Sequence, residues 1–155
     1  MGRALHLRYI SFKKCNLEDE GLPIVFEALS ELKRLKEIDF SCNNVFDRGL
    51  RNICPFIGCS VKQNIRTIKF NQNEISDIGF RKLLQSIEEN ENTIRELGFS
   101  ENQLSDSAAI DLVNFLKNIR MQDVEHSMNI LDVDLTLNKI LFKTVKDVET
   151  QLGIN

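Results

Sequence analysis

The chain has 155 residues, of which 42% are hydrophobic and 28% charged, and its formal net charge is −3. This length and composition are typical of one soluble globular domain with its own core. The slight negative charge gives no electrostatic basis for binding nucleic acid. No apolar run reaches the roughly 20 residues that a membrane-spanning helix requires, and the N-terminus shows no secretory signal. We therefore expect neither a nucleic-acid nor a membrane partner.

The cysteines and histidines show no metal-binding pattern. They are Cys15, Cys42, Cys54 and Cys59, with His6 and His126. No CxxC pair is present, and each histidine stands apart from the cysteines, so the spacing matches no zinc site. We predict free thiols in the reducing interior of a cell, a cytoplasmic localisation, and no bound metal or cofactor.

One pattern of residues occurs five times along the chain. Each copy places apolar residues at positions 1, 4, 6 and 11 and a polar residue, usually Asn, at position 9. The copies begin at residues 7, 35, 65, 94 and 130, so the intervals are 28, 30, 29 and 36 residues. Position 13 is acidic in four copies, and position 15 is glycine in three: Asp19, Asp47, Asp77 and Asp106, then Gly21, Gly49 and Gly79. Such a unit cannot bury its apolar residues alone, so neighbouring copies must stack.

Each copy predicts one strand followed by one helix. Positions 4 and 6 lie two residues apart, so both point to the same side of a short strand. Apolar residues then recur at helical spacing, as Phe80, Leu83, Leu84 and Ile87 do in the third copy. Strands about 30 residues apart need crossover connections, so they should pair in parallel.

The pattern resembles leucine-rich repeats of the ribonuclease-inhibitor type. The resemblance covers nearly the whole chain from about Leu7. It implies an α/β solenoid, a short horseshoe of about five β-α repeats with a parallel sheet on the concave face and helices on the convex face. We expect residues 1–155 to form a single domain, either complete or a fragment of a longer protein. The resemblance also implies a structural ladder in which side-chain amides bond the loop backbone of adjacent repeats: Asn43, Asn73, Asn102 and Asn138.

The expected helices cover about 20–33, 47–57, 78–89 and 107–118, and a final helix follows residue 140. Pro55 predicts that the second helix is short or kinked. Asp77 is placed to cap the first turn of the third helix. Apolar spacing predicts the inward residues of the fourth helix, which are Ile110, Val113, Leu116 and Ile119, and Val145, Val148 and Leu152 indicate a final helix that closes the solenoid.

Two places depart from the regular repeat. The strand over 7–12 follows too few residues for a covering helix, so we expect its edge to be covered by a second copy of the chain or by a longer chain. The last interval is about seven residues longer than the others, which places an insertion at about 120–127. This insertion is either a partner-binding loop or a segment with no specific role.

Strand residues that face away from the core should form columns on the concave sheet. Most of the charged residues in the first two columns are acidic. The candidate partner-binding residues are Tyr9, Glu37, Asp39, Thr67, Lys69, Glu96, Asp132 and Asp134. Like charges on neighbouring strands repel unless a partner balances them. Two interpretations stay open: the face binds a basic protein surface, or it is a solvated face.

No catalytic motif is present, neither a Gly-rich phosphate loop nor a GxSxG sequence, so we predict that the protein is not an enzyme. The favoured function is a non-catalytic adaptor or scaffold that binds a protein through the concave face. Some proteins with this repeat type are GTPase-activating or actin-capping regulators, and this is the first alternative. A structural subunit of a large assembly is the second. Both alternatives rest on analogy of fold.

Overall fold

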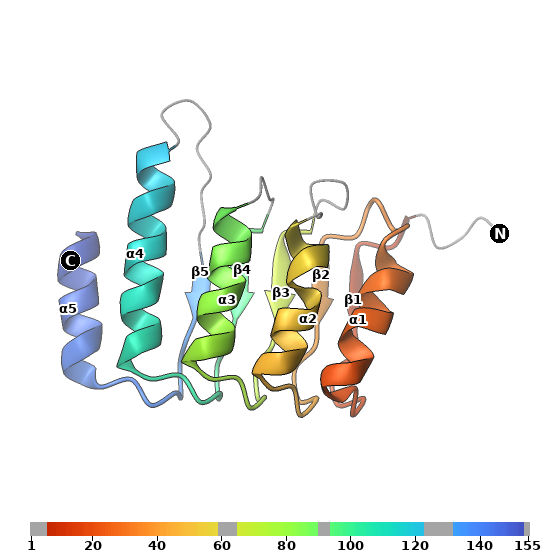
Figure 1. Ribbon diagram of the computed structural model, residues 1–155, viewed down its shortest axis with the longest axis horizontal. Helices are drawn as coiled ribbons and strands as arrows, with labels where there is room; N and C mark the ends of the chain where they lie inside the picture. The colour runs from red at the N-terminus through yellow and green to blue at the C-terminus, as the bar shows by residue number, and fades with distance from the viewer. Residues whose placement is uncertain (1–5, 59–64, 90–93, 123–131, 154–155) are drawn as a thin grey trace.

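The computed structural model describes residues 6–58, 65–89, 94–122 and 132–153. Within these ranges, strands and helices alternate in the order β1 (Tyr9–Ser11), α1 (Glu18–Leu29), β2 (Glu37–Asp39), α2 (Asp47–Gly58), β3 (Thr67–Lys69), α3 (Asp77–Glu88), β4 (Glu96–Gly98), α4 (Asp106–Gln122), β5 (Asp132–Asp134) and α5 (Phe142–Leu152). Figure 1 shows the helices in a row beside the sheet, with α1 and α5 at opposite ends of the row. The predicted α/β solenoid is confirmed.

The strands form one parallel sheet in the order β1-β2-β3-β4-β5. Every strand covers positions 3 to 5 of one copy of the sequence pattern. The register pairs equal positions throughout, so Ile38 of β2 lies between Ile10 of β1 and Ile68 of β3. Equal positions therefore form straight columns on both faces of the sheet.

The core is organised around a column of phenylalanines at position 6. The ring centroids of Phe12 and Phe40 are 5.7 Å apart, those of Phe40 and Phe70 5.5 Å, and those of Phe70 and Phe99 5.6 Å. Phe40, Phe70 and Phe99 are fully buried. Such ring distances are in the range of favourable aromatic pairs. In-register parallel pairing places these rings one above another, which gives the repeats a continuous core.

The amides at position 9 connect each repeat to the one before it. Asn73 Oδ1 accepts hydrogen bonds from the backbone N–H groups of Asn43 and Val45, at 3.0 and 3.1 Å. Its Nδ2 donates to the carbonyls of Phe40 and Phe70. Asn43, Asn102 and Asn138 repeat this arrangement. These bonds satisfy backbone groups that buried turns would otherwise leave unpaired.

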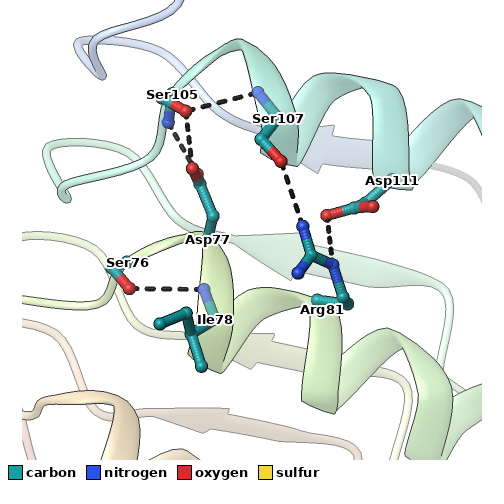
Figure 2. Close-up of polar contacts among 7 residues, drawn as sticks. All are labelled: Ser76, Asp77, Ile78, Arg81, Ser105, Ser107 and Asp111. Carbon is teal, nitrogen blue, oxygen red and sulfur yellow. Dashed lines mark hydrogen bonds and ion pairs between the residues drawn. The ribbon is translucent and has the colours of Figure 1, made fainter.

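The carboxylates at position 13 connect each repeat to the next one. Asp77 accepts the backbone N–H of Ser105 at 2.7 Å and its hydroxyl at 2.5 Å (Figure 2). Asp47 does the same for Ser76. Asp19 and Asp106 accept the N–H groups of Phe46 and Leu141, respectively. The position 13 carboxylate therefore holds the residue that precedes the following helix.

The prediction that Asp77 caps its own helix was wrong. The N-cap of α3 is Ser76, whose side chain accepts the N–H of Ile78 (Figure 2). Serine is a preferred N-cap residue because its short side chain reaches these N–H groups. Asp77 is the first residue of α3, and its side chain points to the next repeat instead.

Two further expectations need correction. Helix α2 has 12 residues, as α1 and α3 do, so Pro55 does not shorten it. Ile110 of α4 is 55% exposed, so it is not an inward residue. It borders a hollow that is also lined by Thr144, Asp147 and Val148 of α5.

Part of the predicted insertion continues a helix. Helix α4 has 17 residues and ends at Gln122, so it includes the first three residues of 120–127. The rest of the insertion lies outside the described residues. Cys59, which follows α2, and His126 also lie outside the described residues.

Candidate partner-binding surface

The concave face presents the two predicted columns. The register places Tyr9, Glu37, Thr67, Glu96 and Asp132 in the first column and Ser11, Asp39, Lys69, Gly98 and Asp134 in the second. Tyr9 is 51% exposed, and Glu96 and Asp132 are exposed. The other charged residues of the columns are half-buried, namely Glu37, Asp39, Lys69 and Asp134. Thr67 differs from the rest, because only 7% of it is exposed. It supports the face rather than offering a contact surface.

Lys69 neutralises part of the acidic face. Its Nζ lies 2.5 Å from Oε1 of Glu37, across the two columns from one strand to the next. The hydrogen bond to Glu37 raises the pKa of Lys69, burial opposes this, and the charges of Glu37, Asp39 and Glu96 raise the pKa further. In the middle of the face, the positive charge of Lys69 therefore offsets the negative charge of Glu37.

Other carboxylates on the face are fixed by neighbouring donors. The hydroxyl of Thr67 donates to Glu96 at 3.0 Å. Asp39 accepts the backbone N–H of Ser41 at 2.9 Å. Asp134 accepts both the N–H and the hydroxyl of Thr136, at 3.0 and 2.7 Å. Because a carboxylate can accept about four hydrogen bonds, each keeps acceptor capacity for a partner.

Three acidic residues of the two columns lie on the neighbouring strands β4 and β5. We call Glu96, Asp132 and Asp134 the acidic end of the concave face. Neither column contains a lysine or arginine on these two strands. Gly98 lies among these three acids, and a Cβ there would be 2.9 Å from Oδ1 of Asn71, which accepts the N–H of Ser100. Gly98 itself is buried, and the side chains of Asn71 and Lys69 occupy the space that a side chain there would need.

The sequence placed these residues in the right columns but missed their pairing. Glu37 and Lys69 were treated as independent contact residues, whereas the structure joins them. The signal that could have identified the pair is the opposite charge at positions 3 and 5 of adjacent repeats, because such neighbours on parallel strands lie within side-chain reach.

The described residues offer no group of three or more His, Cys, Asp or Glu side chains arranged to hold a metal ion. Of the three cysteines described, none is bridged. Across the same ranges, no helix combines the length and apolar character needed to cross a membrane.

Comparisons with known proteins agree with this architecture. A family model described as Leucine Rich repeat matches residues 33–54, which include β2 and its Asn43 turn. The chain is built from leucine-rich repeats.

Two solved structures share the solenoid. One is a tropomodulin C-terminal domain from Caenorhabditis elegans, with a TM-score of 0.70, 14% sequence identity, and coverage of 96% of this chain and 83% of that one. The other is described as leiomodin-1 actin-binding site 2, with a TM-score of 0.63, 13% identity, and coverage of 92% and 79%. At these identities the likeness concerns the fold of the leucine-rich repeats.

Proposed function

We propose that this protein is a non-catalytic interaction module that binds a basic segment of a partner protein at the acidic end of its concave face. The main support for this proposal is the uneven distribution of charge along the sheet. Lys69 neutralises Glu37 in the middle of the face, whereas β4 and β5, which carry Glu96, Asp132 and Asp134, place no lysine or arginine in either column. Complementary charge of this kind favours encounter with a basic partner and selects against acidic ones.

Tyr9 gives the face a possible second contact. It is half exposed at the opposite end of the first column from Asp132. Exposed tyrosines are frequent among the residues that dominate binding energy, because they bury a large rigid ring and keep a polar hydroxyl. A partner that reaches both ends of the face would span all five strands.

A charge reversal at two exposed acids tests this proposal. We would capture partners from a cell extract with the native chain and with a Glu96→Lys/Asp132→Lys variant, identify them by mass spectrometry, and titrate the recovered partner by calorimetry. A matched variant, Glu31→Lys/Glu89→Lys, makes the same charge change at exposed residues outside the columns. The proposal expects at least a tenfold loss of affinity for the first variant and little change for the second. Equal affinities for all three chains would contradict it.

Actin is a second candidate partner, because one structure with this fold is described as an actin-binding site of leiomodin-1. Co-sedimentation with actin filaments and gel filtration with monomeric actin test it directly. Saturable binding in either assay supports an actin-regulating role. Its absence in both removes this candidate and leaves the first proposal to be decided by the charge reversal.

A further inference from the structure

The two ends of the solenoid leave the core unfinished in different ways. At the N-terminal end, Ile10, Phe12 and Leu17 pack against the core but remain partly exposed. At the C-terminal end, an open hollow of about 360 Å³ lies between α4, β5 and α5. It is lined mainly by Leu112, Val133, Leu135, Ile140, Val145 and Val148. One end therefore presents bulky apolar side chains, and the other presents an apolar hollow.

The sequence explains why the ends differ in shape. Position 6 is phenylalanine in the first four repeats but Leu135 in the fifth, and position 4 shrinks to Val133. The aromatic column thus ends at Phe99 on one side, whereas Phe12 has a ring neighbour, Phe40, on one side only in the described structure. Burying such apolar surface is favourable by about 25 cal/mol per Å².

The sheet is also open at both ends. Strands β1 and β5 are the outermost strands, so each pairs with one neighbour among the described strands. An outer strand presents unpaired backbone N–H and C=O groups to any strand that can align with it. Because all strands are parallel, β1 of a second copy could follow β5 in the same direction and register.

The charges at the two edges match in this arrangement. Within the chain, Glu37 is at position 3 of one repeat and Lys69 is at position 5 of the next. Lys69 Nζ lies 2.5 Å from Oε1 of Glu37. Asp134 of β5 and Lys13, two residues after the end of β1, would stand in the same relation across a junction between copies. Thr136 bonds only Oδ1 of Asp134, which leaves Oδ2 for the lysine.

We propose that the C-terminal end of one copy binds the N-terminal end of a second copy, head to tail, with Phe12 entering the hollow and Lys13 pairing with Asp134. The contact joins two different surfaces, so it does not close on itself in a dimer, and assembly grows with concentration. This proposal does not depend on the identity of any partner at the acidic end.

Reciprocal charge reversal tests the pairing. The mass of the native 17.9 kDa chain would be followed by sedimentation velocity over a wide concentration range, beside Lys13→Glu and Asp134→Lys variants. We expect the native mass to rise with concentration and each variant to remain monomeric, because like charges then meet at every junction. An equal mixture of the two variants should assemble again, because every mixed junction joins opposite charges.

Two matched variants, Lys82→Glu and Glu89→Lys, change the same charges at exposed residues of the middle repeat and should assemble like the native chain. Circular dichroism establishes that each variant is folded. A native chain that stays at 17.9 kDa at every concentration overturns the proposal. So does a mixture that fails to recover assembly, or a loss of assembly in the Lys13 variant alone, which would indicate a symmetric contact between N-terminal ends.

Discussion

A Cβ atom on Gly79 would lie 2.5 Å from Oδ1 of Asp47, which belongs to the preceding repeat. The same carboxylate accepts the N–H and hydroxyl of Ser76, so it cannot move away without losing both bonds. Gly49 stands in the same relation to Asp19. Aspartate at position 13 and glycine at position 15 of the next repeat are therefore two sides of one contact.

Replacing Gly79 by alanine tests this contact. The new methyl group would push against Asp47, so we expect a loss of about 1–3 kcal/mol in the free energy of unfolding, as overpacked sites typically show. Urea denaturation measures it. The matched change is Gly21→Ala, where the added atom meets only the side chain of Leu17, the N-cap residue of α1. Alanine favours a helix over glycine by about 1 kcal/mol, so Gly21→Ala should be far less harmful. Equal losses at the two sites would argue against a role for Asp47.

Removing one of the carboxylates at position 13 should weaken the junction between its repeat and the next. Asp77→Ala leaves the N–H and hydroxyl of Ser105 without their acceptor. Ser105 is half-buried, and a hydrogen bond to a charged group contributes about 1.5–3 kcal/mol, so chemical denaturation should show a loss of this order. Asp147→Ala, at an exposed residue of α5, should change stability little. A similarly small effect at Asp77 would contradict the assigned role.

The amide ladder should contribute most in the middle of the solenoid. Asn73 is 4% exposed, whereas Asn138 is half-buried. Asn73→Ala removes bonds to two neighbouring turns, and we expect a loss of about 2–4 kcal/mol because several buried backbone groups lose their partners. Asn138→Ala should cost less, since water can reach the freed groups. Thermal denaturation of both variants compares them, and the reverse order would refute this account.

The Lys69–Glu37 pair predicts a specific dependence on pH. Because the fold raises the pKa of Lys69 above its usual 10.5, the pair stabilises the protein fully below that pH. The contribution is lost as the pH rises through the raised pKa of the folded state. Both side chains are about one third exposed, so the contribution at neutral pH should be about 0.2–1 kcal/mol.

The measurement compares the native chain with Lys69→Gln. The stability difference should be constant from pH 7 to 9 and should vanish in more alkaline solution. Lys82→Gln serves as the control, because it removes the same charge from an exposed residue of α3. A difference that persists unchanged at high pH would mean that the charge of Lys69 is not what stabilises the face.

The fold could be predicted because one pattern specifies strand, turn and helix five times, and equal positions then pair in register. Contacts that cross a junction were harder to predict. Asp77 was assigned to the nearest helix end, whereas its partner Ser105 lies 28 residues later. The inward side of α4 was also misjudged at one position, because helical spacing alone did not show that Ile110 is 55% exposed.

The sequence predicted where the residues of the candidate surface lie, but not which of their charges pair with each other. Column order followed from the register, so Glu37, Lys69 and Glu96 were placed correctly as neighbours. Their pairing depends on side-chain reach and burial, which a linear pattern does not contain. The identity of a partner depends on that partner's own surface, and one repeat architecture supports many.

The carboxylates at position 13 bond the next repeat, and the amides at position 9 bond the preceding one. This arrangement has a consequence for how such a chain can change length. Every internal junction uses the same two kinds of side chain, at positions 13 and 9, so a duplicated repeat carries everything needed to join both of its neighbours. Adding or deleting one whole repeat of 28 to 30 residues should preserve the fold, whereas removing half a repeat would break two junctions at once. A whole repeat can therefore be duplicated or deleted, because the bonds that stabilise the fold lie at the junctions between repeats.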